Sequence, residues 1–197
     1  MSIDTSAAVS SVTFTAFDFE TTGLYPASDR IVEFGAVTFR NGEIIGRFER
    51  LANPGIPISP DAAAVSGISD ADVADATPVA EVVPEFVEFL GDSVLMAHNA
   101  PFDLGFLRAA VQALGLGDIT NAIIDTQLLA MKAFPRRKSY GLQNLAVELG
   151  LPPNRAHRAL DDAIMCMKLF GTCVEELSFM GDLELGEVLT GGAARQG

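Results

Sequence analysis

Residues 12–20 form an apolar, aromatic run that ends in two closely spaced acids, Asp18 and Glu20. Such a run predicts a buried β-strand, in which side chains two residues apart share a face of the sheet. Asp18 and Glu20 therefore point one way, and Phe17 and Phe19 point the other way. Two adjacent carboxylates at the end of a buried strand are costly unless a positive charge lies between them. They are either ligands of a hard divalent cation, which prefers oxygen, or two acids that face water.

The rest of the chain predicts a mixed α/β domain. Two further strand-like runs follow at residues 31–39 and 44–48, with an Asn-Gly hairpin signal between them, and we expect three antiparallel strands at the start of the chain. Short apolar runs at residues 94–97 and 119–124 predict two more strands. Apolar residues at helical spacing predict helices at residues 79–90, 102–114, 126–131 and 142–149 and a last one through residues 163–177. This order predicts a sheet with helices on both faces.

Length and composition fit one globular domain. The chain has 197 residues, of which 49% are hydrophobic, which suffices for one core and is short for two. We expect a loose arm at residues 1–10, a domain at residues 11–178 and a loose, acidic, Gly-rich tail at residues 179–197.

Several features favour a cytoplasmic protein without a membrane partner. No apolar run approaches the length of a membrane span, and the first residues lack the basic start and apolar block of a signal peptide. Cys166 and Cys173 lie about 10 Å apart along a predicted helix, which is too far for a disulfide.

The net charge of −13 by itself argues against a nucleic-acid partner. The charge is unevenly spread, however. Residues 51–107 contain nine acids and no Lys or Arg, whereas residues 130–170 contain seven basic residues and three acids. One face of the protein can therefore still attract phosphate.

Three more residues with possible roles in chemistry lie further along the chain. Asp103 falls in the first turn of the helix after the fourth strand, where an acid often only balances the helix dipole. His157 and Asp162 are five residues apart, about 140° around a helix, so we place His157 before the last helix and Asp162 inside it. The alternatives are a surface histidine and an acidic first turn formed by Asp161 and Asp162.

Together, these segments resemble the three motifs of the DnaQ-like family of 3′→5′ exonucleases, of the DEDDh type. The similar segments are residues 17–23 (Phe-Asp-Phe-Glu-Thr-Thr-Gly), 98–103 (His-Asn-Ala-Pro-Phe-Asp) and 157–162 (His-Arg-Ala-Leu-Asp-Asp), in the family's order. The resemblance runs from about residue 12 to residue 170 and is greatest to the epsilon-type proofreading exonucleases of bacterial DNA polymerase III. It implies a ribonuclease H-like α/β fold, with three antiparallel strands, then two parallel ones.

The resemblance implies a site for two divalent ions, Mg²⁺ or Mn²⁺. The implied ligands are Asp18, Glu20, Asp103 and Asp162, and the implied general base is His157. Two such ions stabilise the attacking and leaving oxygens during phosphodiester hydrolysis. A neutral histidine, with an unperturbed pKa near 6.5, is suited to accept the proton of the attacking water.

The resemblance also implies a pocket for the terminal nucleotide. Its candidate residues are Glu20, Thr21, Thr22, Gly23, Leu24, His98, Asn99 and Phe102. Backbone amides near Gly23 would hold the 3′-hydroxyl end, Leu24 would wedge against a base and Phe102 would stack on one. A helix cap is the alternative for Asn99, and a place in the core is the alternative for Phe102. Ser66 stands where epsilon-type proteins tend to have a histidine near the substrate.

The sequence leaves two other features open. Glu33, inside an apolar strand, either supports the site or pairs with Arg30. The basic turn formed by Arg136, Arg137 and Lys138 either grips the backbone of the incoming strand or is simply exposed.

We expect a metal-dependent 3′→5′ exonuclease that releases nucleoside 5′-monophosphates from single-stranded or frayed ends, with DNA favoured over RNA. The acidic composition fits an enzyme that holds a few nucleotides through metal ions. One alternative is an RNA-trimming exoribonuclease of the same family. Another is a non-catalytic or tethered subunit of a DNA polymerase assembly.

Overall fold

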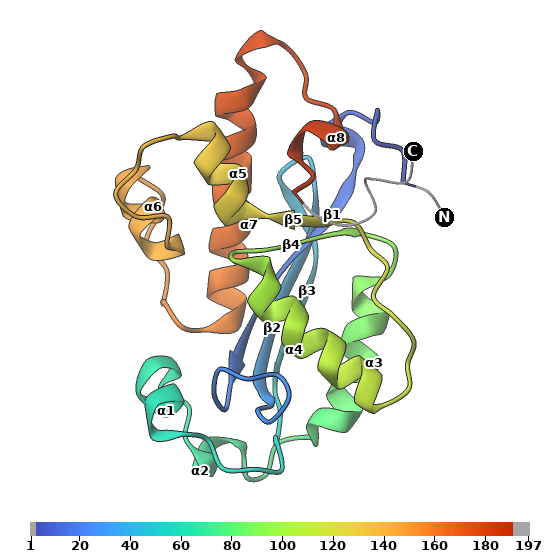
Figure 1. Ribbon diagram of the computed structural model, residues 1–197, viewed down its shortest axis with the longest axis vertical. Helices are drawn as coiled ribbons and strands as arrows, with labels where there is room; N and C mark the ends of the chain where they lie inside the picture. Colours follow the sequence, from blue (N-terminus) through green and yellow to red (C-terminus); the bar gives the residue numbers. More distant parts are fainter. Residues whose placement is uncertain (1–2, 191–197) are drawn as a thin grey trace.

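The computed structural model describes residues 3–190, apart from the side chain of Met180 (Figure 1). At its centre lies a five-stranded sheet with the strand order β3-β2-β1-β4-β5. The strands are β1 (Thr13–Thr21), β2 (Ile31–Arg40), β3 (Glu43–Leu51), β4 (Val94–Ala97) and β5 (Ile123–Asp125). The first three strands form an antiparallel series, and β4 and β5 continue the sheet in parallel with β1. The predicted five-stranded mixed sheet is confirmed.

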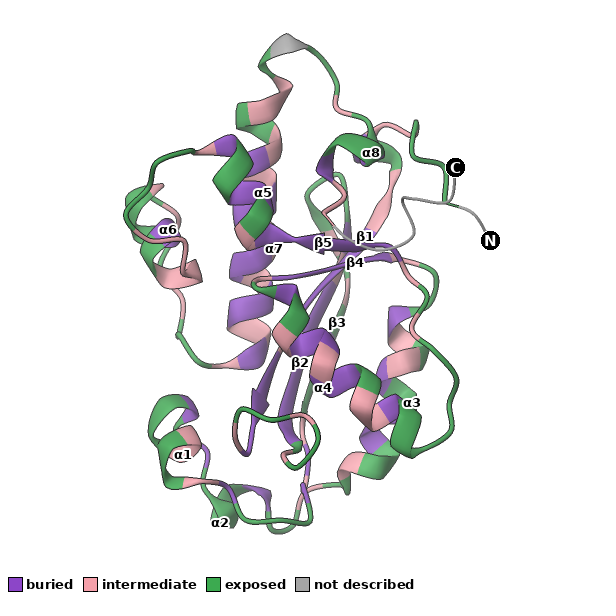
Figure 2. Cartoon of the chain, in the orientation of Figure 1, coloured by how far each residue is buried: buried purple, intermediate pink, exposed green. Residues whose placement is uncertain are grey.

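Helices cover both faces of this sheet (Figure 1). One face packs against α3 (Val79–Leu90) and α4 (Ala100–Ala113), and the other packs against α5 (Thr126–Ala133) and α7 (Ala159–Leu177). The shorter elements are α1 (Pro60–Ser66), α2 (Asp70–Val73), α6 (Leu142–Glu148), α8 (Leu185–Val188) and the 3-10 turns Val9–Ser11 and Ser178–Met180. Figure 2 shows that buried residues follow the strands and the inward side of α7.

Strand β1 divides its side chains between these two layers. Phe14 belongs to the hydrophobic cluster under α7, whereas Phe17 and Phe19 belong to the cluster under α3 and α4. Because side chains alternate along a strand, Asp18 and Glu20 share the face opposite Phe17 and Phe19, as the sequence predicts, and this is the α7 face of the sheet. That parity directs both acids toward the beginning of α7.

Two element boundaries differ from the prediction. The predicted strand at residues 119–124 is only Ile123–Asp125, which pairs with Leu95, Met96 and Ala97 of β4. Helix α4 begins at Ala100 rather than at residue 102, with a proline in its first turn, where the missing N–H leaves no hydrogen bond unmade.

The two ends of the described chain pack against each other. The backbone nitrogen of Val9 donates to the carbonyl oxygen of Leu183 at 3.0 Å, and that of Leu185 donates to the carbonyl oxygen of Ala7 at 2.9 Å. The side chains of Leu185 and Val188 are fully buried in the same cluster as α7.

The predicted loose arm and loose tail are therefore wrong for residues 7–9 and 183–189. The physical reason is burial: apolar side chains in both segments gain contacts with the core that they lack in water. Residues 1–2 and 191–197, which complete the predicted arm and tail, lie outside the described residues.

Cys166 and Cys173 are both buried free thiols, in agreement with their predicted separation along one helix. Across residues 3–190, none of the helices has the length and apolar character that crossing a membrane requires.

Candidate active site

The candidate site begins where β1 and β4 part. The two strands pair only from Phe14 to Ala16 of β1, so the later residues of β1 have no strand beside them on that edge. Asp103, in the first turn of α4, occupies this edge, and its Oδ1 accepts a hydrogen bond from the backbone nitrogen of Phe19 at 3.1 Å. The Asp103 side chain is buried beside Asp18. The end of the sheet pairing thus brings two distant acids to one place.

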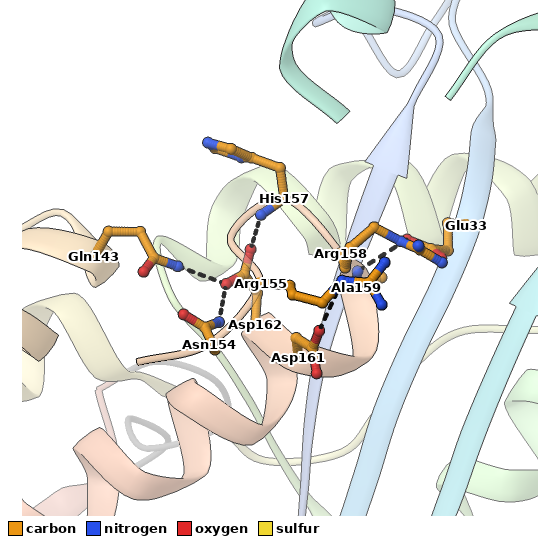
Figure 3. Close-up of polar contacts among 9 residues, drawn as sticks. All are labelled: Glu33, Gln143, Asn154, Arg155, His157, Arg158, Ala159, Asp161 and Asp162. Carbon is orange, nitrogen blue, oxygen red and sulfur yellow. Dashed lines mark hydrogen bonds and ion pairs between the residues drawn. The ribbon is translucent and has the colours of Figure 1, made fainter. Parts of the chain in front are cut away.

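Asp162, in the first turn of α7, lines the same cavity as Asp103, and Figure 3 shows its hydrogen bonds. Its Oδ1 accepts hydrogen bonds from Gln143 Nε2 and Asn154 Nδ2, both at 2.7 Å, and its Oδ2 accepts one from the backbone nitrogen of His157 at 2.8 Å. His157 lies before the helix and Asp162 inside it, as predicted. Three donors, one from α6 and two from the connection between α6 and α7, fix this carboxylate.

The start of α7 lies directly on β2. A Cβ atom added to Gly35 would lie 2.0 Å from the carbonyl carbon of Ala159, so only glycine allows this approach. Glu33, on the same face of β2, accepts hydrogen bonds from Arg158 Nε at 3.0 and 3.2 Å and from the Ala159 backbone nitrogen at 3.0 Å (Figure 3). The Arg158 Nη2 atom also donates to Glu33. The proposed pairing of Glu33 with Arg30 is therefore wrong.

The Glu33–Arg158 pair also changes the electrostatic environment of Glu20. Glu33 lies directly opposite Glu20 in the antiparallel register of β1 and β2. Like charges that face each other across strands repel. Burial, the charge of Asp162 and the charge of Glu33 raise the pKa of Glu20, and the guanidinium of Arg158 partly offsets this rise. Arg158 also anchors the turn that carries His157.

His157 is exposed and has a left-handed backbone conformation, with a φ of 61°. Non-glycine residues adopt this conformation rarely, and when they do so it is often at functional sites. Ligand atoms of His157, Glu20 and Asp162 all lie within 4.8 Å of one another. This trio could hold a metal ion.

Electrostatics join the four acids into one cluster. Burial raises the pKa of Asp18 well above its usual value, and the charges of Asp103, Asp162 and Glu20 raise it further. Burial, followed by the charge of Asp162, raises the pKa of Glu20 to about 7. Burial raises the pKa of Asp103 to about 8, although the Phe19 N–H opposes this shift. Burial also raises the pKa of Asp162, against the hydrogen bond from Asn154.

A divalent cation fits this donor set. Repulsion between buried carboxylates is what a cation relieves, and carboxylate oxygen and imidazole nitrogen are both common metal ligands. The arrangement can therefore bind metal and place it beside a free imidazole.

A cavity of about 950 Å³ opens over the cluster. All five residues predicted for metal binding and proton transfer line it. It is also lined by most of the predicted nucleotide-pocket residues: Glu20, Thr21, Gly23, Leu24, His98, Asn99 and Phe102. Thr22 is the exception, and the prediction that it lines the pocket is wrong. Thr22 is buried, and its hydroxyl donates to Asp29 Oδ1 at 3.2 Å and accepts from the Arg30 backbone nitrogen at 3.0 Å.

His98 lines the cavity with both ring nitrogens already engaged. Its Nε2 donates to the carbonyl oxygen of Tyr140 at 2.7 Å, so its Nδ1 accepts from the hydroxyl of Thr126 at 3.0 Å. Burial lowers its pKa and favours this neutral form. Through these two hydrogen bonds, His98 connects the segment before α6 to the start of α5.

Asn99 and Phe102 each agree in part with the alternative to nucleotide binding, which is a helix cap for Asn99 and a core position for Phe102. Asn99 is the residue that precedes α4, but its side chain makes no capping hydrogen bond. The ring of Phe102 is half-buried and packs on Phe106, with 5.1 Å between ring centroids, while it also faces the cavity.

Large exposed apolar side chains surround the mouth of the cavity. Leu24 and Tyr25 are 69% and 70% exposed, and Val65 on α1 is 55% exposed. The first motif, residues 17–23, predicts Leu24, which comes directly after it. Tyr25 is the next residue, so its proximity to the motif could also have identified it. Val65 carries no such signal. Ser66 does not line the cavity, because its hydroxyl donates to Ala62 and accepts from Ile68.

Sequence reasoning missed Gln143 and Asn154, which hold Asp162. Neither residue lies in a motif, and only the folded chain brings them to the site. The basic turn lies apart from the cavity lining: Arg137 faces Glu148 at 3.9 Å and lies over the ring of Phe134.

A cleft lined by carboxylates and an exposed histidine, where two central strands of the sheet diverge, is typical of enzymes that cleave phosphodiesters with divalent metal ions. The chain belongs to the exonuclease family, whose sequence model matches residues 15–170. It is a 3′→5′ exonuclease, in agreement with the sequence prediction, and members of the family depend on divalent metal ions.

Two curated relatives place the chain within the family. It is 44% identical over 165 residues to DNA polymerase III subunit epsilon of Treponema pallidum, a match that covers 83% of this chain and 77% of that protein. It is 40% identical over 176 residues to the PolC-type DNA polymerase III of Thermotoga maritima, covering 89% of this chain but only 13% of that much longer protein. The epsilon-type resemblance is therefore confirmed.

Solved structures confirm the ribonuclease H-like fold. Exonuclease X in complex with 5′-overhanging duplex DNA matches with a TM-score of 0.67 and 30% identity, over 83% of this chain and 91% of that one. Exonuclease I of E. coli in complex with single-stranded DNA matches with a TM-score of 0.72 over 84% of this chain and 40% of that one. At 20% identity, this second match bears on the fold alone.

Proposed function

We propose that this exonuclease removes nucleotides from the 3′ ends of single-stranded or frayed DNA and releases nucleoside 5′-monophosphates. The observation that carries the proposal is the cluster of four mutually repelling carboxylates beside His157, in a cavity with an open mouth. Asp18, Glu20, Asp103 and Asp162 would hold two divalent ions, Mg²⁺ or Mn²⁺. When bound, such ions neutralise the charge that develops on a phosphodiester as it is hydrolysed.

His157 is the proposed general base. Its imidazole is exposed at the cavity, close to Glu20 and Asp162, and its backbone nitrogen is held by Asp162. The backbone of His157 is therefore held in place and its ring is open to water, so a proton taken from the attacking water at a ring nitrogen can pass on to solvent.

The mouth of the cavity supports a single-stranded end as the substrate. Leu24, Tyr25 and Val65 expose apolar surface that can pack on unpaired bases, whose faces are hidden in a stacked duplex. The acidic surface, with a net charge of −13, provides little attraction for a long duplex. Substrate affinity then depends on the metal ions and on a few stacked bases.

We further propose that the chain edits DNA ends made by a polymerase. This rests on its 44% identity to an epsilon subunit of DNA polymerase III and on the DNA in the exonuclease X complex. An RNA-trimming activity is the alternative, and the substrate test separates the two.

The test uses 5′-labelled oligonucleotides of one sequence as DNA and as RNA, each single-stranded, fully paired or with a mismatched 3′ end. We expect stepwise shortening of single-stranded and mismatched DNA with Mg²⁺ or Mn²⁺, and none with EDTA. Asp18→Asn should reduce the rate by about 10²–10³-fold or more, with an unchanged circular dichroism spectrum. If the wild-type protein shortens neither polymer with metal present, the proposal is wrong; faster shortening of RNA would support the exoribonuclease.

A further inference from the structure

We propose that the side-chain amides of Gln143 and Asn154 are positioning residues that hold Asp162 in place before a metal ion binds, and that Asp162 offers the ion its Oδ2 atom. This inference rests on the proposed function, because it assigns roles within the same metal site. It concerns two residues outside the three motifs.

The two oxygens of Asp162 are not equivalent. An ionised carboxylate has about four lone-pair sites, two on each oxygen. Oδ1 accepts two short hydrogen bonds, from Gln143 and Asn154, and is therefore fully engaged. Oδ2 accepts one, from the backbone of His157, and keeps one site free. Metal binding through Oδ2 breaks none of these bonds.

Asp162 is also the most tightly held of the four acids. Asp103 accepts a single hydrogen bond from another residue, the Phe19 N–H. Within residues 3–190, no hydrogen-bond donor reaches the side-chain oxygens of Asp18 or Glu20. With three hydrogen bonds, Asp162 therefore has the orientation that the protein itself fixes most fully. Partners of this kind typically orient ligands and strengthen metal binding.

The geometry of Asn154 shows what sets its orientation. Its Nδ2 donates to Asp162, while its own Oδ1 is buried without a hydrogen-bond partner among the described residues. A buried acceptor without a partner is unfavourable, so an amide that served only packing would gain by turning that oxygen toward a donor. The bond to Asp162 therefore decides which way this amide points.

Neutral amides are suited to this task. A Lys or Arg at either position would also bind Asp162, but its charge would repel an incoming cation. Gln143 belongs to the first turn of α6 and Asn154 to the connection between α6 and α7. The amide pair thus joins two segments to the ligand-bearing start of α7.

The test measures Mn²⁺ binding by isothermal titration calorimetry without nucleic acid, and then kcat and KM on a single-stranded DNA oligonucleotide. The variants are Gln143→Met and Asn154→Leu, which keep most of the side-chain volume and lose the donor. Gln112→Met, on the exposed surface of α4, is the matched control. We expect each site variant to weaken Mn²⁺ binding by about 10-fold or more and to lower kcat more than it changes KM, with the control unchanged.

The inference is overturned if Gln143→Met binds Mn²⁺ like the wild type and keeps its kcat. Gln143 is half-buried at the cavity wall, so this variant decides the matter even if Asn154→Leu fails to fold. The proposed function fails separately: a wild-type protein that binds Mn²⁺ but shortens no oligonucleotide refutes the function, while the comparison of Mn²⁺ affinities still tests the two amides.

Discussion

His157 combines three properties that each have a local cause. The turn before α7 gives it a left-handed backbone, the Asp162 carboxylate holds its backbone nitrogen, and its exposed ring reaches the cavity. A base and a metal ligand would both need a ring at this place. Single substitutions can therefore distinguish the two roles.

Replacing His157 by alanine should lower kcat by about 10²–10⁴-fold, the usual contribution of a general base. If His157 acts as a base and not as a ligand, Mn²⁺ affinity measured by calorimetry should stay within about twofold of the wild type. Near-normal turnover in His157→Ala would remove it from the base role, and a large loss of Mn²⁺ affinity would make it a ligand. His98→Gln, which keeps an amide beside Tyr140, is the comparison for general effects on the cavity.

Arg158 makes the only ion pair with a buried acid that the structure describes within residues 3–190. Its partner Glu33 has a side chain that is 1% exposed. Arg158→Met should lower the free energy of unfolding by about 3 kcal/mol, because it leaves a buried carboxylate unpaired. Urea denaturation measures the change.

Arg155→Met provides the matched control for this prediction. Arg155 lies three residues earlier and faces Asp161 at 4.0 Å, with 73% of its side chain exposed. Exposed pairs contribute about 0–1 kcal/mol, so this variant should be nearly neutral. Equal effects of the two substitutions would contradict the role given to the buried pair.

At the scale of elements, the site depends on how closely α7 approaches β2. Gly35 and Ala159 make backbone contact there, and the Glu33 carboxylate accepts a hydrogen bond from the Ala159 backbone nitrogen at the same place. Asp162, one turn into the helix, then lies across the cleft from β1. A shift of the helix would move this acid away from Asp18 and Glu20 without altering either of them.

Gly35→Ala should therefore destabilise the protein by about 3 kcal/mol and also reduce activity, because the added methyl group meets backbone atoms that cannot turn aside. Thermal unfolding and the nuclease assay measure the two effects. Gly171→Ala in α7 is the control, because its added methyl group meets nothing within 4 Å. We expect that variant to be stabilised by up to about 1 kcal/mol. A Gly35→Ala protein as stable as the wild type would contradict the close approach.

At the scale of the whole molecule, the acid cluster links stability to pH and to metal. Glu20 and Asp103 have pKa values raised to about 7 and about 8 by burial and neighbouring charge. In the unfolded chain such groups titrate near 4. Between these values the folded protein binds more protons than the unfolded one, so its stability falls as the pH rises.

The melting temperature of the metal-free protein should therefore fall as the pH is raised from about 5 to about 8. Mn²⁺ should raise the melting temperature more at pH 8 than at pH 5, because a cation favours the ionised carboxylates. Glu20→Gln should show a shallower pH dependence in the absence of metal, and the difference from the wild type isolates the cluster from other titrating groups. A melting temperature that rises with pH, with the same slope in both proteins, would refute the linkage.

The alternation of apolar and acidic residues in β1, the hairpin signal and the helical spacings predicted most of the fold, because these patterns reflect local geometry and burial. They also predicted the shared face of Asp18 and Glu20, and the separate positions of His157 and Asp162. Residues without a local pattern could not be predicted in this way. Leu185 and Val188 follow an acidic segment, and only their burial shows that they belong to the core.

By itself, the sequence determined which residues are candidates for chemistry and in which elements they lie. The tertiary structure decided how they are held: Glu33 pairs with Arg158 rather than Arg30, the Thr22 hydroxyl bonds to Asp29, and Gln143 and Asn154 bind one oxygen of Asp162. The physical reason is the distance along the chain over which each kind of interaction acts. Strand parity and helix period act over a few residues, whereas the partners of a buried polar group are set by whichever distant segment packs against it.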